Sequence, residues 1–289
     1  IYLDQIQKFP NKVLLNGPKG IGKKLFVNHF LNYFHSKENK QSYNLKNYEY
    51  NLSNNISKLI SSNTHPNILK IYRKNDKKII DIDQIREMIK FTNQTSFNND
   101  RRFIIIENVN LLGINSANAL LKSIEEPNNK IHFILINNSE FKVLETIKSR
   151  CLEFKLSLLN SEVMEIVNYH FGDNIYNNIN LDYINNYNSP SFLISLVNFL
   201  ESNDLYIKET SIEDLLIYVI KNKSYTSNDF IKEYLNLFIE LFFYKNINTS
   251  KKISFKIKKY FYLKLSFVKK YNLDFESFFL EFNDKLLSD

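Results

Sequence analysis

The segment that most constrains the fold is a glycine-rich loop that follows a short apolar run. Val13-Leu14-Leu15 precedes Gly17-Pro18-Lys19-Gly20-Ile21-Gly22-Lys23-Lys24. Gly17, Gly20, Gly22 and Lys23 stand in a phosphate loop, where glycines let backbone N–H groups turn inward around an anion. Such a loop joins a buried strand to the first turn of a helix. The sequence therefore predicts a parallel α/β domain with its loop after the first strand.

The first 155 residues alternate short apolar runs with helical patterns. The predicted strands are continuous apolar runs, as in a buried parallel sheet: Val13–Leu15, Ile68–Tyr72, Phe103–Ile106, His132–Ile136 and Leu152–Leu156. The helices predicted between them are Lys24–Phe34, Asp83–Phe91 and Ser116–Ile124, the last of which is stopped at Pro127. The Asn-rich stretch Ser36–Asn63 is predicted to be irregular.

After Leu159 the pattern is helical throughout. The spacing predicts short helices at Ser161–Phe171, Leu181–Asn186 and Ser191–Leu200, with longer aromatic helices from about Glu209. Aromatic and aliphatic side chains form stripes at helical spacing: Ile231, Tyr234, Leu235, Phe238, Leu241 and Phe242, then Phe275, Phe278, Phe279 and Phe282. Two interpretations remain open, the core of a helix bundle or an exposed assembly face.

Composition excludes several classes of protein. The chain of 289 residues has one cysteine, which excludes an internal disulfide and a Cys-rich zinc site. It has no run of 18 apolar residues, so we expect a cytoplasmic protein with no membrane partner. A net charge of +7 permits contact with nucleic acid without establishing it.

The loop departs from its pattern at the last position. A Ser or Thr hydroxyl normally follows the loop lysine and binds Mg²⁺, but Lys24 is an ammonium with donors only. The strand Phe103–Ile106 is followed by Glu107-Asn108, where nucleotide hydrolases place a metal-binding Asp and a catalytic Glu. Glu107 keeps a carboxylate, which is either a metal neighbour or a solvated strand-end group. Asn108 cannot act as a base.

Several further motifs occur in a characteristic order. They are Thr64-His65-Pro66-Asn67, Asn118-Ala-Leu-Leu-Lys-Ser-Ile-Glu-Glu-Pro127, Phe133-Ile-Leu-Ile-Asn-Asn138 and Thr146-Ile-Lys-Ser-Arg-Cys151. Over residues 12–155 the chain thus resembles AAA+ clamp-loader subunits, and among them the delta-prime subunits of bacterial DNA polymerase III. The resemblance implies an AAA+ domain at 1–158, an all-helical lid at 159–206 and an all-helical collar that forms oligomers at 207–289.

The resemblance also implies roles for single residues. Arg150, between Ser149 and Cys151, resembles an arginine finger that enters the ATP site of a neighbouring subunit. The alternative is an Arg that pairs with a local carboxylate. Asn137 or Asn138 stands at the phosphate-sensing position after the fourth strand. In the lid, Asn188-Ser189-Pro190-Ser191-Phe192 resembles a stretch in which motor subunits carry a second sensing Arg.

These departures favour a non-catalytic, stator-type subunit that presents Arg150 to an adjacent ATPase. The implied partners are ATPase motor and delta-type subunits, with the sliding clamp and primed DNA reached through the complex. The alternatives are an ATP-hydrolysing clamp-loader subunit, kept open by Lys23 and Glu107, and a plain DNA-binding AAA+ protein.

The same departures limit which cofactors the chain is expected to bind. Weak, magnesium-independent ATP or ADP binding is compatible with Gly17–Lys23. No zinc is expected, because Ser36–Asn63 lacks cysteine and His29, His35 and His65 are too few to replace it. Lysines gather among aromatics near the C-terminus, where they are either a phosphate-contacting surface or the solvated face of a bundle: Lys251, Lys252, Lys256, Lys258, Lys259, Lys264, Lys269 and Lys270.

Overall fold

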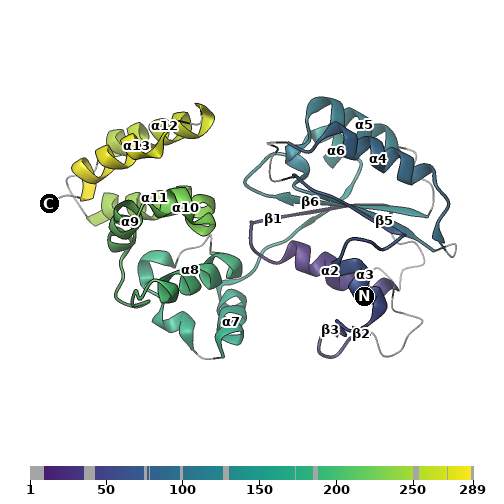
Figure 1. Cartoon of the computed structure of the whole chain (residues 1–289), viewed down its shortest axis with the longest axis horizontal. Coiled ribbons are helices and arrows are strands. Elements are labelled where there is room, and N and C mark those ends of the chain that lie inside the picture. Colours follow the sequence, from purple (N-terminus) through teal and green to yellow (C-terminus); the bar gives the residue numbers. More distant parts are fainter. Residues whose placement is uncertain are drawn as a thin grey trace. The chain divides into compact units, whose positions relative to one another are not determined.

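The structure is a computed structural model that divides the chain into two compact units, Ile1–Ser157 and Leu158–Asp289. It describes residues 10–35, 43–74, 77, 79–97, 100–125, 130–172, 174–184, 188–249, 254–271 and 273–287. The predicted helix stop at Pro127 and the predicted surface lysines Lys251 and Lys252 lie outside these residues. Each unit is described by itself (Figure 1).

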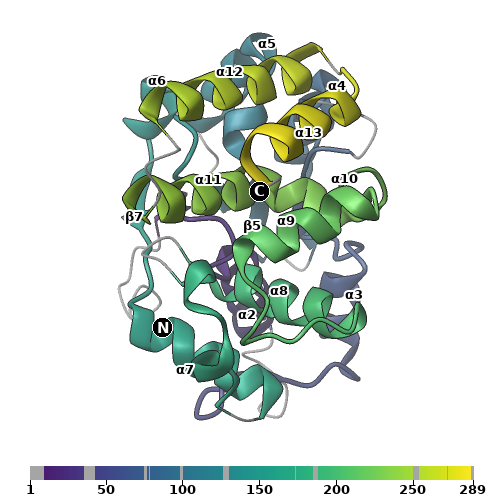
Figure 2. The same cartoon turned by 90° about the vertical axis from the view of Figure 1, so that its left-hand side faces the viewer.

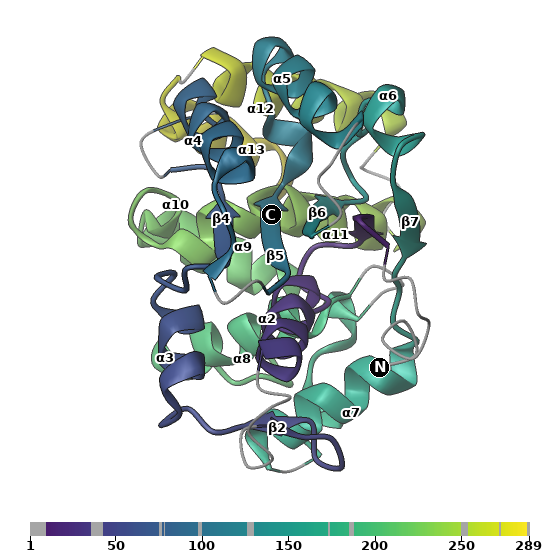
Figure 3. The same cartoon turned by 90° about the vertical axis from the view of Figure 1, so that its right-hand side faces the viewer.

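The described part of the first unit contains a parallel sheet of five strands in the order β4-β5-β6-β1-β7 (Figure 3). The strands are β1 (Lys12–Gly17), β4 (Ile68–Ile71), β5 (Arg102–Glu107), β6 (Ile131–Asn138) and β7 (Leu152–Lys155). All the predicted strands are therefore confirmed. Because β1 pairs with both β6 and β7, the loop that follows β1 lies between the carboxyl ends of its neighbours.

Helices cover both faces of this sheet, which explains why its strands are apolar throughout (Figure 1). On one face α2 (Lys23–His35) and α3 (Asn55–Ser61) pack on side chains such as Phe103 and Ile105. On the other face lie α4 (Ile82–Asn93), α5 (Ile114–Glu125) and the single turn α6 (Glu145–Lys148). The predicted helices of this unit are thus confirmed.

The polar stretch Ser36–Asn63, predicted to be irregular, contains regular structure. Residues 36–42 lie outside the described residues, but β2 (Tyr43–Asn44) and β3 (Glu49–Tyr50) form a short antiparallel pair, followed by α3. The prediction was wrong because α3 is only seven residues long and stands in an Asn-rich stretch. Asn54 caps it by accepting a hydrogen bond from Ile56 N at 3.0 Å, and the buried Ile60 anchors it to the sheet.

In its described residues the second unit contains helices and turns but no strand. Its described α-helices are α7 (Asn160–Phe171), α8 (Pro190–Ser202), α9 (Ile212–Lys221), the single turn α10 (Ser224–Ser227), α11 (Asp229–Thr249), α12 (Phe255–Tyr271) and α13 (Phe275–Phe282). Short 3₁₀ turns stand at Ile175–Asn178 and Leu181–Tyr183, and a π-helical turn at Asn283–Leu287. The predicted helix Leu181–Asn186 is therefore only a 3₁₀ turn, whose Asn180 side chain caps Asp182 N, and residues 185–187 are not described.

One buried cluster runs from Val163 of α7 to Phe282 of α13. In Figures 1 and 2, α12 and α13 lie together beyond α11. The ring centroids of Phe242 on α11 and Phe282 on α13 are 5.2 Å apart. The predicted aromatic stripes of α11 and α13 thus form a core. The division of this unit into lid and collar stays a prediction.

The lysines of α12 lie mostly on its outer side. Phe261, Leu265 and Val268 are buried, whereas Lys256, Lys259 and Lys270 are exposed. Lys258 lies over the ring of Tyr262 at 5.6 Å, and Lys264 pairs with Glu281. Within the described residues, no helix is long and apolar enough to cross a membrane.

Candidate functional site

The loop after β1 has the backbone that its glycines permit. Gly20 and Gly22 adopt φ values of 82° and 89°, in the left-handed region that favours glycine. Phe26 N then donates to Gly22 O at 2.8 Å, which begins the helix. Gly17 is required for a different reason, because a Cβ there would lie 2.4 Å from Leu156 O. The sequence therefore builds a phosphate-loop backbone packed closely against the end of β7.

Lys23 is turned into this loop. Its side chain is buried, and its Nζ donates to Gly17 O at 2.7 Å and to Pro18 O at 2.6 Å. Burial lowers the pKa of Lys23 to about 8, although the Glu140 carboxylate opposes the shift. The Lys23 ammonium thus stabilises the phosphate loop by bonding to its backbone carbonyls.

Lys24 and Glu107 meet across the same edge of the sheet. Lys24, in the first turn of α2, places its Nζ 3.0 Å from Glu107 Oε1 and 3.1 Å from Oε2. The Lys24 side chain is 64% exposed, but that of Glu107 at the end of β5 is only 15% exposed. A carboxylate so far removed from water needs a cationic partner, and Lys24 is that partner.

Asn108 and Asn138 form a second contact at this edge. Asn108 has a left-handed backbone, with φ 54° and ψ 58°, and its Oδ1 accepts a hydrogen bond from Asn138 Nδ2 at 3.0 Å. The residues beside the loop are thus an ammonium, a carboxylate bound to it, and paired amides. Mg²⁺ requires oxygen ligands in an octahedral arrangement, so this set does not fit the metal. Within the described residues, no cluster of three or more His, Cys, Asp or Glu could hold a metal ion.

Asn137 points into the protein. Its side chain is buried, and Nδ2 lies 3.0 Å from each of Asn16 Oδ1, Asn138 O and Phe141 O. Asn16 in turn donates to Glu153 Oε1 at 2.9 Å. These bonds join the end of β6 to β1, and β1 to β7. Of the two candidates for the sensing position, Asn138 has the more accessible side chain.

The Ser149-Arg150-Cys151 motif lies at the opposite edge of the sheet. Leu152 begins β7 and pairs with Val13 near the start of β1, whereas the phosphate loop follows the end of β1. At about 3.3 Å per residue, the length of β1 separates the two edges by roughly 16 Å. This exceeds the reach of an Arg side chain, so Arg150 does not serve its own loop.

Arg150 has local partners in this structure. Its Nη2 and Nε donate to Glu125 Oε1 at 2.8 Å and 3.1 Å, and its Nη1 donates to Thr146 O at 3.0 Å. Both side chains of the Arg150–Glu125 pair are substantially exposed, at 37% and 49%. The pairing with a local carboxylate, left open by the sequence, is thus observed. Glu125 was overlooked, although it stands in the quoted motif that ends at Pro127.

The residues that flank Arg150 have different surroundings. Ser149 Oγ donates to Thr146 O at 3.3 Å. Cys151 packs against the core beneath α4 and α5, and burial raises the pKa of its thiol to about 11. Cys151 therefore contributes to packing, and a buried thiol with a raised pKa is mostly protonated near pH 7.

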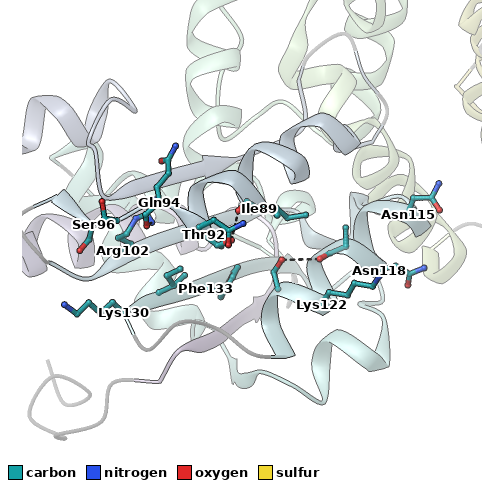
Figure 4. Close-up of a pocket in the computed structure, with 15 residues that line it drawn as sticks. Ile89, Thr92, Gln94, Ser96, Arg102, Asn115, Asn118, Lys122, Lys130 and Phe133 are labelled. Atoms are coloured by element: carbon teal, nitrogen blue, oxygen red, sulfur yellow. Dashed lines mark hydrogen bonds between the residues drawn. The ribbon is translucent and has the colours of Figure 1, made fainter.

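A groove of about 1110 Å³ lies elsewhere on the first unit, between α4 and α5 (Figure 4). Its lining mixes polar and apolar side chains, and the polar ones include Gln94, Asn118, Lys122 and Lys130. At one end the Arg102 guanidinium stacks on Phe91 at 3.6 Å and donates to Gln94 O at 2.5 Å. Arg102 begins β5, so this end lies at the edge away from the phosphate loop. Asn118 and Lys122 belong to the motif Asn118–Pro127, but the sequence did not predict a groove there.

Phe192 lies inside the second unit. Its ring is buried and lies 5.1 Å from that of Tyr234 and 5.9 Å from that of Phe238. A buried phenyl ring cannot donate a hydrogen bond to phosphate. This chain therefore lacks a cation at the position where the resemblance placed a second sensing Arg in motor subunits.

A parallel sheet with a phosphate loop after β1, joined to a helical unit, defines a P-loop protein of the AAA+ class. The family model described as "DNA polymerase III, delta subunit" matches residues 4–160. The chain belongs to this family, and curated proteins named DNA polymerase III subunit delta' are among its relatives.

Two of these relatives are named DNA polymerase III subunit delta'. The Pseudomonas aeruginosa protein is 31% identical over 140 residues, covering 48% of this chain and 41% of its own length. The protein of Buchnera aphidicola from Schizaphis graminum is 36% identical over 170 residues, covering 58% of this chain and 49% of its own. The chain thus spans about half the length of the curated relatives it matches.

Among solved structures, a DNA polymerase III gamma subunit-related protein from Thermotoga maritima has a TM-score of 0.50 and 17% identity. The alignment covers 97% of this chain and 95% of that protein. This likeness concerns the fold alone.

Proposed function

We propose that this chain is a non-catalytic stator subunit of a cytoplasmic DNA polymerase III clamp loader. It supplies Arg150 as an arginine finger to the ATP site of an adjacent motor subunit. The complex then opens the sliding clamp and places it on primed DNA.

The observation that carries the proposal is the position of Arg150. The residue lies at the edge of the sheet opposite its own phosphate loop, on an exposed turn between α6 and β7. A guanidinium in this place can reach the phosphates of a neighbouring subunit but not its own. Its planar fork of donors suits the charge that develops on a transferred phosphoryl group.

The chain's own loop supports the non-catalytic part of the proposal. The Lys24 ammonium replaces the metal-binding hydroxyl and binds Glu107, and Asn108 has no basic group to activate water. Lys23 remains, but it donates to the loop carbonyls of Gly17 and Pro18.

Residues 207–289 would hold the subunit in the ring as a collar. On α12 the side chains of Leu263, Phe267 and Tyr271 are about half exposed, at 50%, 49% and 57%. They lie at helical spacing, and the rings of Phe267 and Tyr271 stack at 6.0 Å. An apolar stripe of this kind suits packing against another helix. The proposed partners are the ATPase motor and delta-type subunits.

The test is ATP turnover by the reconstituted loader with its clamp and primed DNA, in which only the adjacent motor subunit keeps a working phosphate loop. Arginine fingers contribute on the order of 10³–10⁵ in rate, so Arg150→Ala should reduce turnover of this site by at least about 10³. Arg150→Lys should recover little of it, because an ammonium lacks the planar fork.

Arg86→Ala is the matched control, because Arg86 is also exposed and paired, with Asp83 at 2.8 Å. It should leave turnover unchanged, and size-exclusion chromatography should show each complex still assembled. Wild-type turnover in an assembled Arg150→Ala complex would refute the finger.

The alternative, an ATP-hydrolysing subunit, rests on the retained Lys23 and Glu107. It predicts magnesium-dependent ATP hydrolysis by the purified chain and loss of clamp loading in the Lys23→Ala complex. The stator proposal predicts no turnover by the purified chain and normal loading with Lys23→Ala.

A further inference from the structure

The Lys24–Glu107 pair has the geometry of a filled cation site. One Nζ lies almost equally far from the two carboxylate oxygens, at 3.0 Å and 3.1 Å. Glu107 is the last residue of β5 and Lys24 belongs to the first turn of α2. In a phosphate loop with Ser or Thr at position 24, this is the space between the hydroxyl and the acidic strand end, where a divalent cation is bound.

A second lysine reinforces the positive charge at this place. Lys70 on β4 is partly buried, and its Nζ donates to Ile60 O at 3.0 Å and to Asn28 Oδ1 at 3.2 Å. Burial lowers the pKa of Lys70, while the nearby Glu107 charge raises it and Lys24 lowers it further. Lys24 contacts the Glu107 carboxylate directly, and Lys70 interacts with it electrostatically without a direct contact, so both charges would repel a divalent cation there.

The ligands for a metal are also missing on the loop side. Lys24 offers donors only, and the oxygens of Gly17 and Pro18 accept hydrogen bonds from Lys23. Asn108 Oδ1 accepts from Asn138 Nδ2. The oxygens of Gly17, Pro18 and Asn108 thus already accept hydrogen bonds within the protein.

We propose that the Lys24 ammonium is a built-in replacement for the divalent cation of a phosphate loop. It neutralises Glu107 permanently and excludes Mg²⁺ and Mn²⁺ from the loop, with or without a nucleoside diphosphate. This inference concerns the chain's own loop, whereas the proposed function depends on Arg150, so either can fail without the other.

The test uses Mn²⁺ as a paramagnetic probe, with the full chain in the presence and absence of ADP. Electron paramagnetic resonance should find no more Mn²⁺ bound to the wild-type chain than to Glu107→Gln. Lys24→Thr restores the hydroxyl and removes the ammonium, and with ADP it should bind Mn²⁺ at least about ten-fold more tightly than wild type. The double variant Lys24→Thr/Glu107→Gln should lose this gain.

Lys19→Thr is the matched control, because it removes a charge from the same loop without touching the Lys24–Glu107 pair. It should not gain Mn²⁺ binding, and thermal unfolding should show that every variant is folded. The proposal is overturned if the wild-type chain binds Mn²⁺ in a manner that depends on Glu107. It is also overturned if folded Lys24→Thr gains no site.

Discussion

At the residue scale, burial fixes the protonation state of several histidines at the amino edge of the sheet. His35, the last residue of α2, lies against His65 with ring centroids 4.4 Å apart and against Phe103 at 5.6 Å. Its Nε2 is buried without a hydrogen-bond partner in the described residues. Burial, and then the charge of His65, lowers the pKa of His35 to about 3. The folded protein therefore keeps this ring neutral.

This shift predicts that acid destabilises the protein through His35. Above pH 6.5 the His35 ring is neutral in both the folded and the unfolded chain. As pH falls from 6.5 toward 3, the unfolded chain binds a proton at this ring and the folded chain does not. The free energy of unfolding should therefore fall by up to about 1.4 kcal/mol per pH unit in this window. In His35→Phe, this part of the pH dependence should be absent.

Urea unfolding between pH 7 and pH 4, followed by circular dichroism, measures the effect. His65, with Asp100 near it, and Arg101 over Phe34 also lie at this cluster and can contribute to the pH dependence. The pH dependence of the free energy of unfolding is therefore compared between wild type and His35→Phe. His170→Phe is the control, because that histidine is exposed, and it should keep the wild-type slope. An unchanged slope in His35→Phe would contradict the prediction.

The sequence predicted the members of the site but not their partners. Lys24, Glu107 and Asn108 were identified from local patterns, since each follows a recognisable strand. Their pairing depends on the parallel register that brings the end of β5 beside the first turn of α2, 83 residues away in the chain. The Arg150–Glu125 bond spans 25 residues and depends on where α5 ends, which no local motif specifies.

At the element scale, the elements that are stabilised by continuous apolar runs were predicted correctly, whereas those that depend on single caps or distant contacts were missed. The strands are buried on both faces, so continuous apolar runs revealed them. Helix α3 depends on the Asn54 cap and on Ile60, a signal too weak against its Asn-rich surroundings. Leu181–Tyr183 forms a 3₁₀ turn and not the predicted α-helix. Tyr183 is buried, and its hydroxyl donates a hydrogen bond to Ser211 O at 2.9 Å, which holds the turn in place. Tertiary contacts of this kind are invisible to periodicity.

The packing of α13 predicts a large effect of one substitution. Phe282 is fully buried, and its ring centroid lies 5.2 Å from those of Phe242 and Phe261. Phe282→Ala should reduce the free energy of unfolding by about 3–5 kcal/mol, because it removes apolar area and leaves a cavity. Chemical denaturation of the full chain measures this loss.

Leu280→Ala is the control on the same helix, since Leu280 is 60% exposed. It should change stability by less than about 0.5 kcal/mol. Equal losses in the two variants would mean that α13 contributes through helix formation and not through its buried face.

At the scale of the whole molecule, the two edges of the sheet have opposite character. At the carboxyl edge, Lys24 and Lys23 are held by buried or partly buried acceptors and complete the loop internally. At the amino edge, Arg150 is held by Glu125 in a pair that is open to solvent. Exposed pairs contribute only about 0.2–1 kcal/mol, so Arg150 can leave Glu125 at little cost. The first unit thus has a loop closed by its own lysines at one edge of the sheet and an exposed cation at the other.

If the proposed function holds, Glu125 competes with the neighbour's phosphates for Arg150. Glu125→Gln keeps the size of the side chain but removes the charge, so turnover of the adjacent ATP site should rise, by at most about five-fold for a pair worth up to about 1 kcal/mol. The measurement is the single-site turnover assay with the reconstituted loader. Asp83→Asn, which breaks the exposed Arg86–Asp83 pair, should have no effect. A fall in turnover comparable to that of Arg150→Ala would instead mean that Glu125 holds the guanidinium in its working orientation, because a carboxylate that merely competes cannot be needed for activity.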